Sequence, residues 1–295
     1  MMKILILGAN GYLGSQLCKL YSKEAKVLGT YNKNSNDDLQ LLKWQANDYV
    51  ALEQIINAFN PNLIINCVGL ANVDTCEMLP EKALMLNSIM LHEIGRICYR
   101  LNVKLVHIST DHFQGSTDLA LNEEDTVSCP NVYSYSKILG EQYLLHSNPA
   151  SIILRANFFH FTKDSNKNFI DSCLNLTSKF SKINGFSDVI FTPVSTTYLK
   201  KGISKLFDID YYGVIHVASS ESISKFEFLK EILLATGQTN IEIVNKSIDD
   251  AKLLAPRPKF MALSNKKYQM LTDEVVPSIN KMIKSELISA KILIE

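Results

Sequence analysis

The sequence has little that would indicate a nucleic acid or a membrane as a partner. Its 30 basic residues are balanced by 30 acidic ones, so it lacks the strong positive field that attracts phosphate backbones or anionic lipids. The apolar run 4–7 near the start is too short for a signal-peptide core or a membrane span. We therefore expect a cytoplasmic protein with no nucleic-acid or membrane partner.

Cysteine and histidine lack the spacings that form metal sites or disulfide frameworks. The six cysteines include no Cys-x-x-Cys pair, and the six histidines include no His-x-x-x-His pair. A chain of 295 residues with 46% hydrophobic content can bury a large core without disulfides. These absences favour free thiols in a reducing compartment and no metal.

What the sequence does contain is a regular alternation over its first two-thirds. Short β-branched runs alternate with segments of helical period, which is typical of parallel strands joined by helical crossovers. The pattern predicts an α/β fold with a Rossmann-type, doubly wound parallel sheet. The expected strands are 3–7, 26–31, 62–68, 103–109 and 151–155, and the expected helices are 14–22, 49–59, 80–101 and 133–146.

After about residue 157 the alternation becomes irregular, which indicates a smaller C-terminal lobe. A helix is expected over 169–180, a loop at 192–193, a strand at 213–217 and a helix at 225–236. We expect residues 1–156 to form one domain and residues 157–295 mainly a second, with later segments returning to the first domain's sheet.

A glycine-rich loop directly follows the first expected strand and opens the first helix. Its spacing is Gly-x-x-Gly-x-x-Gly, and it supplies the candidate residues Gly8, Asn10, Gly11, Tyr12, Leu13 and Gly14. Glycines let the backbone approach a pyrophosphate, and a helix N-terminus offers amide donors to it. The alternative is a tight strand-to-helix turn. The position at the start of an alternating chain favours dinucleotide binding by domain 1–156.

The end of the second strand indicates which dinucleotide is bound. A carboxylate there would bind the adenosine ribose, whereas a basic residue would accept a 2′-phosphate. The strand ends Thr30-Tyr31-Asn32-Lys33, without a carboxylate. Tyr31 and Lys33 therefore favour NADPH, with NADH kept as the alternative because Lys33 also fits a solvated loop charge.

Tyr133 and Lys137 stand four residues apart in the helix expected over 133–146, so they share one face. A nearby cation favours the phenolate and brings the pKa of a tyrosine from about 10 toward neutrality. The pair can therefore act in acid-base catalysis, and Lys137 can also hold a nicotinamide ribose. The alternative is an amphipathic helix with one buried ring and one solvated lysine.

Thr110 ends the apolar strand that precedes this helix. Side chains at the carboxyl ends of parallel strands face the ligand crevice. Thr110 can donate a hydrogen bond to a carbonyl oxygen that gains negative charge during hydride attack. The alternative for Ser109-Thr110-Asp111 is a turn or a helix cap.

Taken together, these motifs resemble the dTDP-4-dehydrorhamnose reductase family of extended short-chain dehydrogenases. The resemblance covers nearly the whole chain. Its matching segments are 8–14, 66–69 with Val73-Asp74 and Glu77, Asn87, 109–111, 131–137 with Gly140-Glu141, Leu154-Arg155, 192–194, 213–216 and Arg257-Pro258.

The resemblance implies NAD(P)H-dependent reduction of the 4-keto group of a nucleotide-linked deoxysugar, in the biosynthesis of cell-surface polysaccharide. Thr110, Tyr133 and Lys137 would be the catalytic residues. Further cofactor-binding candidates are Asp48, Cys67, Val68 and Gly69, which join the glycine loop, Tyr31, Lys33, Tyr133 and Lys137. Substrate-binding candidates are Val73, Asp74, Thr110, Asp111, Phe158 and Arg257.

Several positions depart from the family pattern. Gln45 stands where an Asp near the adenine is usual, and Phe158 replaces the usual Trp after the sixth strand. The stretch after Thr110 is one residue shorter, and 188–191 lacks an Asp-Gln-x-Gly pattern. Most of these changes lie on the substrate side, so another sugar or another nucleotide stays open as the substrate.

Other functions remain as alternatives. Epimerases and dehydratases of nucleotide sugars share the fold and the triad, although dehydratases carry an acidic pair where this chain has Asp111-His112. The family also resembles the non-catalytic regulatory subunit of methionine adenosyltransferase, and an NADPH-sensing module is a third alternative. The resemblance leaves a homodimer open as the assembly.

Overall fold

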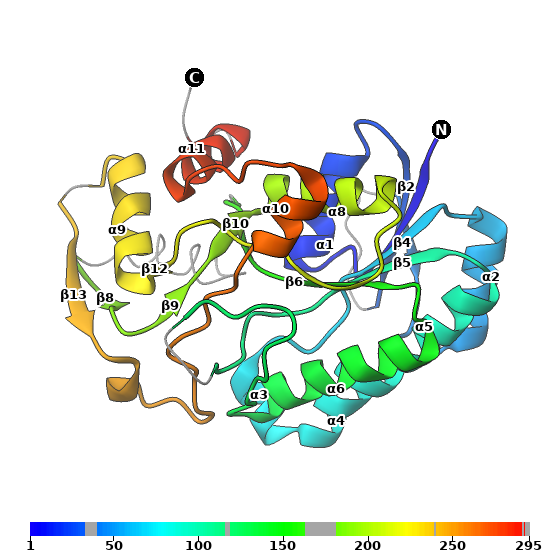
Figure 1. The fold of residues 1–295 in the computed structure, drawn as a ribbon, viewed down its shortest axis with the longest axis horizontal. Helices are drawn as coiled ribbons and strands as arrows, with labels where there is room; N and C mark the ends of the chain where they lie inside the picture. The colour runs from blue at the N-terminus through cyan, green and yellow to red at the C-terminus, as the bar shows by residue number, and fades with distance from the viewer. Residues whose placement is uncertain (33–39, 116–118, 163–180, 239, 291, 293–295) are drawn as a thin grey trace. The chain divides into compact units, whose positions relative to one another are not determined.

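The chain folds into two compact units in the computed structural model, which describes residues 1–32, 40–115, 119–162, 181–238, 240–290 and 292 (Figure 1). Each unit combines three separate segments of the chain. The first unit consists of residues 1–110, 129–155 and 200–215, and the second consists of residues 111–128, 156–199 and 216–295.

A seven-stranded sheet of order β11-β6-β5-β4-β1-β2-β3 forms the centre of the first unit. Neighbouring strands from β6 to β3 pair in parallel. The chain moves outward from β1 through β2 and β3, and then restarts at β4 on the other side of β1. This order confirms the Rossmann-type fold expected from the sequence. The strands are β1 (Lys3–Leu7), β2 (Lys26–Tyr31), β3 (Leu41–Lys43), β4 (Leu63–Asn66), β5 (Lys104–Ile108), β6 (Ile152–Arg155) and β11 (Gly213–His216).

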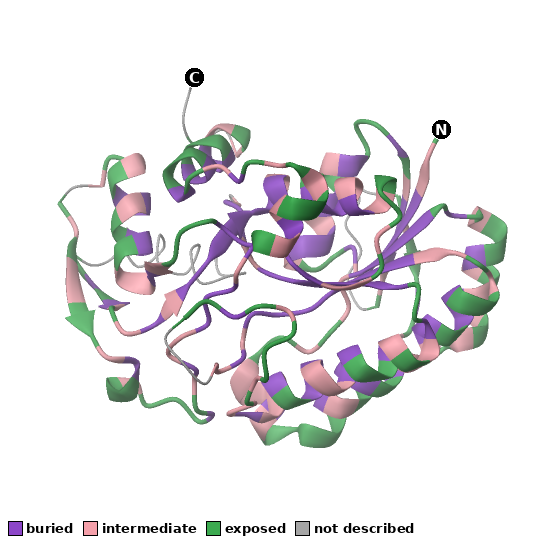
Figure 2. Ribbon diagram, in the orientation of Figure 1, coloured by how far each residue is buried: buried purple, intermediate pink, exposed green. Residues whose placement is uncertain are grey.

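The central strands are buried along nearly their whole length, as Figure 2 shows. A parallel sheet covered by helices on both faces requires such continuous apolar runs. On one face lie α1 (Tyr12–Tyr21) and the later part of α8 (Thr196–Asp208), where the Tyr21 hydroxyl donates to the carbonyl of Lys200 at 3.2 Å. On the other face α2 (Tyr49–Phe59), α5 (Met90–Arg100) and α6 (Val132–Ser147) pack onto a shared core.

The helical stretch expected over 80–101 is present, but it is not a regular α-helix throughout. The structure has α4 (Pro80–Leu84), a π-helical segment η1 (Met85–Ile89) and then α5, preceded by the short helix α3 (Val73–Met78). No proline or glycine marks the break in the sequence. The π turn brings Asn87 and Ser88 against α6, where Ser88 Oγ donates to the Ser136 carbonyl at 2.7 Å.

The second unit contains short strands in three two-stranded sheets, β10-β7, β12-β9 and β13-β8. Edge-to-face contacts join Phe228 to Phe159 and Phe191, with ring centroids 5.2 and 5.3 Å apart. Its elements are β7 (Asn157–Phe159), β8 (Lys182–Phe186), β9 (Ile190–Phe191), β10 (Pro193–Ser195), β12 (Ile223–Ser224), α9 (Lys225–Ala235), β13 (Glu242–Lys246), η2 (Ile248–Asp250), α10 (Lys266–Thr272) and α11 (Ile279–Ser289).

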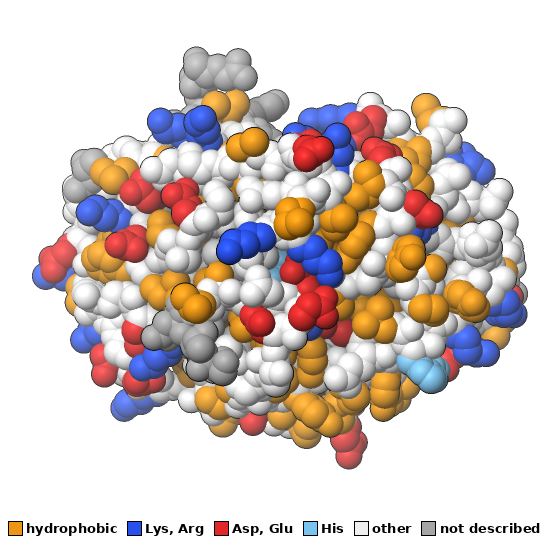
Figure 3. Space-filling view, viewed as in Figure 1, with side chains coloured by type: hydrophobic (Ala, Val, Ile, Leu, Met, Phe, Trp, Pro, Cys, Tyr) orange, Lys and Arg blue, Asp and Glu red, His pale blue; other side chains and the backbone are white. Residues whose placement is uncertain are grey.

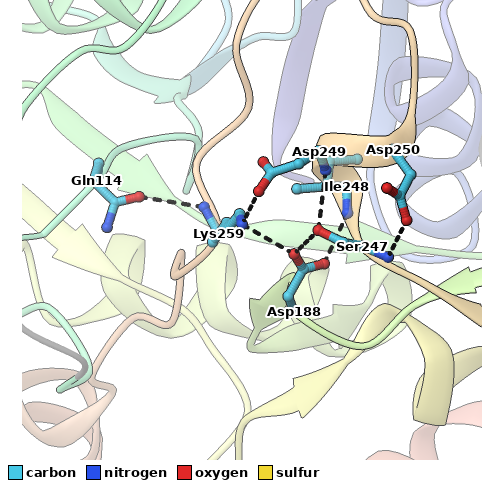
Figure 4. A network of polar contacts seen from close by, with 7 residues as sticks. All are labelled: Gln114, Asp188, Ser247, Ile248, Asp249, Asp250 and Lys259. Atoms are coloured by element: carbon cyan, nitrogen blue, oxygen red, sulfur yellow. Dashed lines mark hydrogen bonds and ion pairs between the residues drawn. The ribbon is translucent and has the colours of Figure 1, made fainter.

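Polar contacts fix the segment that follows β13, as Figure 4 shows. The carboxylate of Asp188 accepts from the hydroxyl of Ser247 at 2.6 Å and from the Ile248 amide at 2.9 Å. Lys259 forms ion pairs with Asp188 and Asp249. The loop before β9 is thereby tied to η2 and to the segment around Lys259.

The sequence places the helix over 225–236 almost as observed, because α9 begins with a capping box formed by Ser224 and Glu227. The loop expected at 192–193 is partly wrong, since Pro193 begins β10. The helix expected over 169–180 lies outside the described residues.

Candidate functional site

The loop after β1 has the backbone geometry that a close approach to phosphate requires. Gly8 has a φ of +80°, which favours glycine, and the Gly11 amide donates to its carbonyl at 3.0 Å. A Cβ on Gly14 would lie 2.3 Å from that same carbonyl oxygen. The N-cap residue of α1, Gly11, supplies no side-chain cap. The residues present therefore fit a dinucleotide pyrophosphate at the N-terminus of α1.

The loop after β4 lies beside the glycine loop. The Cys67 amide donates to the Leu7 carbonyl at 3.0 Å, and a Cβ on Gly8 would lie 3.1 Å from the Val68 side chain. Burial raises the pKa of Cys67 far above its ordinary value, so its thiol stays protonated. The candidates in the glycine loop and those in the loop after β4 therefore lie next to each other. This is the place where the order of the strands reverses, between β1 and β4.

A cavity of about 330 Å³ lies in the first unit near the end of β2. Its lining includes Asn32 and Gln45, the residue that stands where the family usually has an Asp near the adenine. The other lining residues were not singled out by the sequence, namely Ala46, Asn47, Tyr49, Lys82, Met85, Leu86 and Met90. Tyr31 ends β2 and is partly buried, whereas Lys33 lies outside the described residues. Asp48 is exposed and caps α2, accepting from the Ala51 amide at 3.0 Å.

Tyr133 and Lys137 both lie on α6, one helical turn apart. The helix begins with a capping box between Asn131 and Ser134. The buried Nζ of Lys137 is held in place by a hydrogen bond of 3.0 Å to the carbonyl of Ile108, two residues before Thr110. Burial lowers the pKa of Lys137 to about 8. The structure thus brings Lys137 to the strand end that carries Thr110.

A buried ion pair anchors α6 to the sheet. Arg155 on β6 binds both oxygens of Glu141, with Nη2 at 2.6 Å from Oε2 and Nε at 3.0 Å from Oε1. The hydroxyl of Ser109 also donates to Glu141. These contacts hold α6 one turn beyond Lys137.

Asn87 in the π-helical segment connects α6 to the loop after β4. Its Nδ2 donates to Ser136 Oγ at 2.9 Å, and its Oδ1 accepts from the Leu70 amide at 2.7 Å. Gly140 makes this approach close, because a Cβ there would lie 2.0 Å from the Asn87 carbonyl oxygen.

Val73 and Asp74 begin the short helix α3, which is tied to the start of α6. Glu77 on this helix accepts from the Val132 amide at 3.0 Å. The two substrate candidates therefore belong to the element that contacts the residue before Tyr133.

The other substrate candidates lie in the second unit. Asp111 is buried and accepts from Asn157 Nδ2 at 2.9 Å, and burial raises the pKa of its carboxyl to about 6. Phe158 lies on β7, and Arg257 donates to the Ala255 carbonyl at 2.7 Å. Burial and, to a smaller extent, the positive charges of Lys225 and Arg257 lower the pKa of His112 to about 3. Two cations therefore act on His112 within this unit.

His107 is a site residue that the motif analysis missed. It lies inside the apolar strand β5, contacts Lys137 on one side and Asn66 on the other, and is buried. The signal that could have found it is a polar residue in the middle of an apolar strand, two residues before Ser109-Thr110.

Figure 3 shows acidic and basic side chains interspersed over the face in view. Within the described ranges, no group of histidine, cysteine, aspartate and glutamate side chains is arranged to hold a metal ion. In the same part of the chain no helix is both long and apolar enough to cross a membrane.

The order of the sheet, the glycine loop after β1 and the Tyr-Lys pair on α6 define a protein of the extended short-chain dehydrogenase class. The chain belongs to the family described as the RmlD substrate binding domain, whose model matches residues 2–291. The family resemblance seen in the motifs is thereby confirmed.

Relatives of known name agree with this assignment. The spore coat polysaccharide biosynthesis protein SpsK of Bacillus subtilis is 27% identical over 268 residues, covering 90% of each chain. The structure of a dTDP-4-dehydrorhamnose reductase of Clostridium acetobutylicum matches with a TM-score of 0.84 at 28% identity, covering 98% of this chain and 100% of the other. The dTDP-4-dehydrorhamnose reductase of Bacillus anthracis, solved in complex with NADP, matches with a TM-score of 0.82 at 25% identity and the same coverage.

Proposed function

We propose that this protein reduces the 4-keto group of a nucleotide-linked deoxysugar to an alcohol with NADPH, as a homodimer in the cytoplasm. The observation that carries the proposal is the position of Lys137. Its Nζ is held on the Ile108 carbonyl, beside the strand end of Thr110 and one helical turn from Tyr133. This arrangement supports a catalytic role for all three side chains.

In the proposed reaction, the glycine loop and residues 67–69 would hold NADPH, which would supply the hydride for the carbonyl carbon. Tyr133 gives its hydroxyl proton to the carbonyl oxygen, and Thr110 donates a hydrogen bond to that oxygen as charge develops. Protonated Lys137 stabilises the tyrosinate that remains. Ketone, NADPH and one proton thus become alcohol and NADP⁺, and Tyr133 is restored by a proton from water.

The first unit is the proposed dinucleotide-binding part. The pyrophosphate would bind the amides of the glycine loop, because Gly8 and Gly14 leave no room for side chains there. The cavity lined by Gln45 and Tyr49 has a size and position suited to the adenine. Residues 67–69, beside the glycine loop, would pass along the cofactor. NADPH is favoured over NADH because the end of β2 lacks a carboxylate.

The second unit carries further substrate-binding candidates, whereas Val73 and Asp74 belong to the first unit. Lys225 and Arg257 provide positive charge suited to the diphosphate of a nucleotide sugar. Phe158 offers an aromatic face to the sugar. The similarity to reductases of dTDP-linked sugars and to a polysaccharide biosynthesis protein supports this substrate class.

The test follows loss of NADPH absorbance with dTDP-, GDP-, UDP- and CDP-linked 4-keto-6-deoxy sugars, with NADH in parallel. Tyr133→Phe removes the proton donor, so we expect kcat to fall by about 10²–10⁴-fold. Tyr135→Phe is the matched control, because Tyr135 lies on the same helix but is 52% exposed. It should retain activity.

Two outcomes would contradict the proposal. One is equal turnover by Tyr133→Phe and the unmodified protein. The other is tight NADPH binding without turnover of any keto sugar, which would favour an epimerase or a regulatory subunit.

A further inference from the structure

The contacts of Asn66 determine how its side-chain amide is oriented. Its Oδ1 accepts from the Val68 amide at 3.1 Å, which leaves Nδ2 to face Nδ1 of His107 at 3.1 Å. An amide Nδ2 only donates hydrogen bonds, so Nδ1 of His107 must be the acceptor. A neutral imidazole then carries its proton on Nε2.

The proton on Nε2 of His107 points to Lys137. The two nitrogens, His107 Nε2 and Lys137 Nζ, lie 3.0 Å apart. An ammonium group has three donors and no lone pair, so it cannot accept this proton. The observed arrangement therefore suits an uncharged Lys137 amine, which accepts from His107 and donates to the Ile108 carbonyl.

A charged Lys137 requires the opposite tautomer of His107. With its proton on Nδ1, His107 can accept from the ammonium at Nε2. The Asn66 amide must then turn its oxygen toward His107, which places its NH₂ group against the Val68 amide. One hydrogen bond in a buried site is lost as a result.

The other groups around Lys137 do not replace that loss. Cys67 from the loop after β4 and Cys76 from α3 act on it, but burial raises the pKa of both thiols, that of Cys76 to about 11. Glu141 on α6 is already bound by Arg155. Tyr133 lies one turn away on the same helix.

We propose that His107 is a positioning residue whose tautomer is coupled to the charge of Lys137. When the pair takes up one proton, the Nε2 proton of His107 moves to the Lys137 amine and a proton from water binds Nδ1 of His107. His107 stays neutral throughout, and the pair gains a single positive charge on Lys137. The lowered pKa of Lys137 and the strongly lowered pKa of His107 agree with this coupling.

The coupling deepens the proposed function, because only protonated Lys137 can stabilise the tyrosinate of Tyr133. Activity would then fall as the pH rises through the shared midpoint of His107 and Lys137. The direct test, however, needs neither substrate nor cofactor, so it can fail or succeed independently of the reductase assignment.

The experiment is an NMR titration of the full chain with ¹⁵N-labelled histidine and ¹³C-labelled lysine, with signals assigned through His107→Gln and Lys137→Met. We expect His107 to carry its proton on Nε2 at high pH and on Nδ1 at low pH. The midpoint should coincide with that of Lys137 and lie below the ordinary lysine value of about 10.4. An imidazolium at His107, a single tautomer throughout, or an ordinary midpoint for Lys137 would overturn the proposal.

Two variants separate coupling from a merely structural role. Asn66→Asp accepts from both the Val68 amide and Nδ1–H of His107, so it should fix the Nδ1 tautomer at every pH. His107→Gln can turn its oxygen to Lys137, so the Lys137 midpoint should rise by about one unit. His146→Gln is the control. His146 is exposed and lies on α6, the helix of Lys137, so its replacement should leave the Lys137 midpoint unchanged.

The same variants have an expected kinetic signature. If the reductase assignment holds, kcat/KM at pH 9 relative to pH 7 should be about fivefold higher in His107→Gln than in the unmodified protein. An unchanged pH profile in both variants, despite a folded state, would contradict the coupling.

Discussion

Asp111 is a carboxyl group held away from water in the second unit, with Asn157 as a hydrogen-bond donor. Burial raises the pKa to about 6, and Asn157 and the charge of Lys225 only partly oppose that shift. The pKa in the folded protein is thus higher than the value of about 3.9 expected in the unfolded chain. The ionised carboxylate therefore destabilises the fold above about pH 6, and this penalty disappears as the pH falls from 6 toward 4.

Asp111→Asn should therefore raise the melting temperature at pH 7.5 and lose about half of that gain at pH 5. Asparagine keeps an oxygen for Asn157 and never ionises, and a shift of about two pKa units corresponds to on the order of 1–3 kcal/mol. Thermal unfolding at the two pH values measures the effect. Asp208→Asn, which changes an exposed carboxyl, should show no such pH-dependent difference. A loss of stability at pH 7.5 in Asp111→Asn would contradict the argument.

The position of helix α6 depends on a buried ion pair with β6. Glu141 and Arg155 are 2% and 6% exposed, so neither charge is screened by water. Removing one partner of such a pair leaves an uncompensated charge in the interior, which is far more costly than removing both.

Arg155→Met should destabilise the protein by about 3–5 kcal/mol, and the double variant with Glu141→Leu should recover most of that loss. Urea denaturation measures the free energy of unfolding of both variants, and the values can be compared directly when the m-values are equal. As a control, Arg100→Met breaks the more exposed pair with Glu53 and should cost at most about 1 kcal/mol. If the double variant is no more stable than Arg155→Met, the buried charge is not the cause.

Elements with strong local signals were predictable from the sequence, whereas elements that depend on distant partners were not. The bounds of β1, β2 and α2 agree with the sequence expectation, because each combines an apolar pattern with a turn or a cap. Strand β3 has three residues, too few to show a period, and exists through its pairing with β2. The two-residue strands β9 and β12 are determined by each other.

The candidate site likewise has residues that the sequence indicates and contacts that only the fold brings about. The glycine loop, Thr110, Tyr133 and Lys137 were singled out as candidates from their order along the chain. The contacts of Lys137 with His107 and Ile108 were not, since β5 and α6 are distant in sequence and meet only in the folded sheet. The same holds for Asn87, which reaches Ser136 from the π-helical segment.

For the whole molecule, cofactor binding is expected to couple to stability. A ligand that binds only the folded state stabilises it by about 2.7 kcal/mol at 100 times its Kd. The end of β2 has no carboxylate to bind the 2′-hydroxyl of NADH, so NADPH should raise the melting temperature more than NADH at equal concentration.

Differential scanning fluorimetry with both cofactors tests this expectation. Gly14→Ala provides the control. The added Cβ would lie 2.3 Å from the Gly8 carbonyl oxygen and disturb the glycine loop, so this variant should not be stabilised by either cofactor. A larger shift with NADH would contradict the cofactor preference.

The π-helical segment η1 has a consequence for how the chain tolerates changes in length. Its turn holds one more residue than an α-helical turn, so every residue after it is rotated by about 100° from its place in a continuous α-helix. Deleting one residue from Met85–Ile89 would therefore let the segment become α-helical while the buried side of α5, with Leu91 and Ile94, keeps facing the core. What the deletion would remove is the local turn that brings Asn87 and Ser88 against α6, so the extra residue serves those contacts and not the packing of α5.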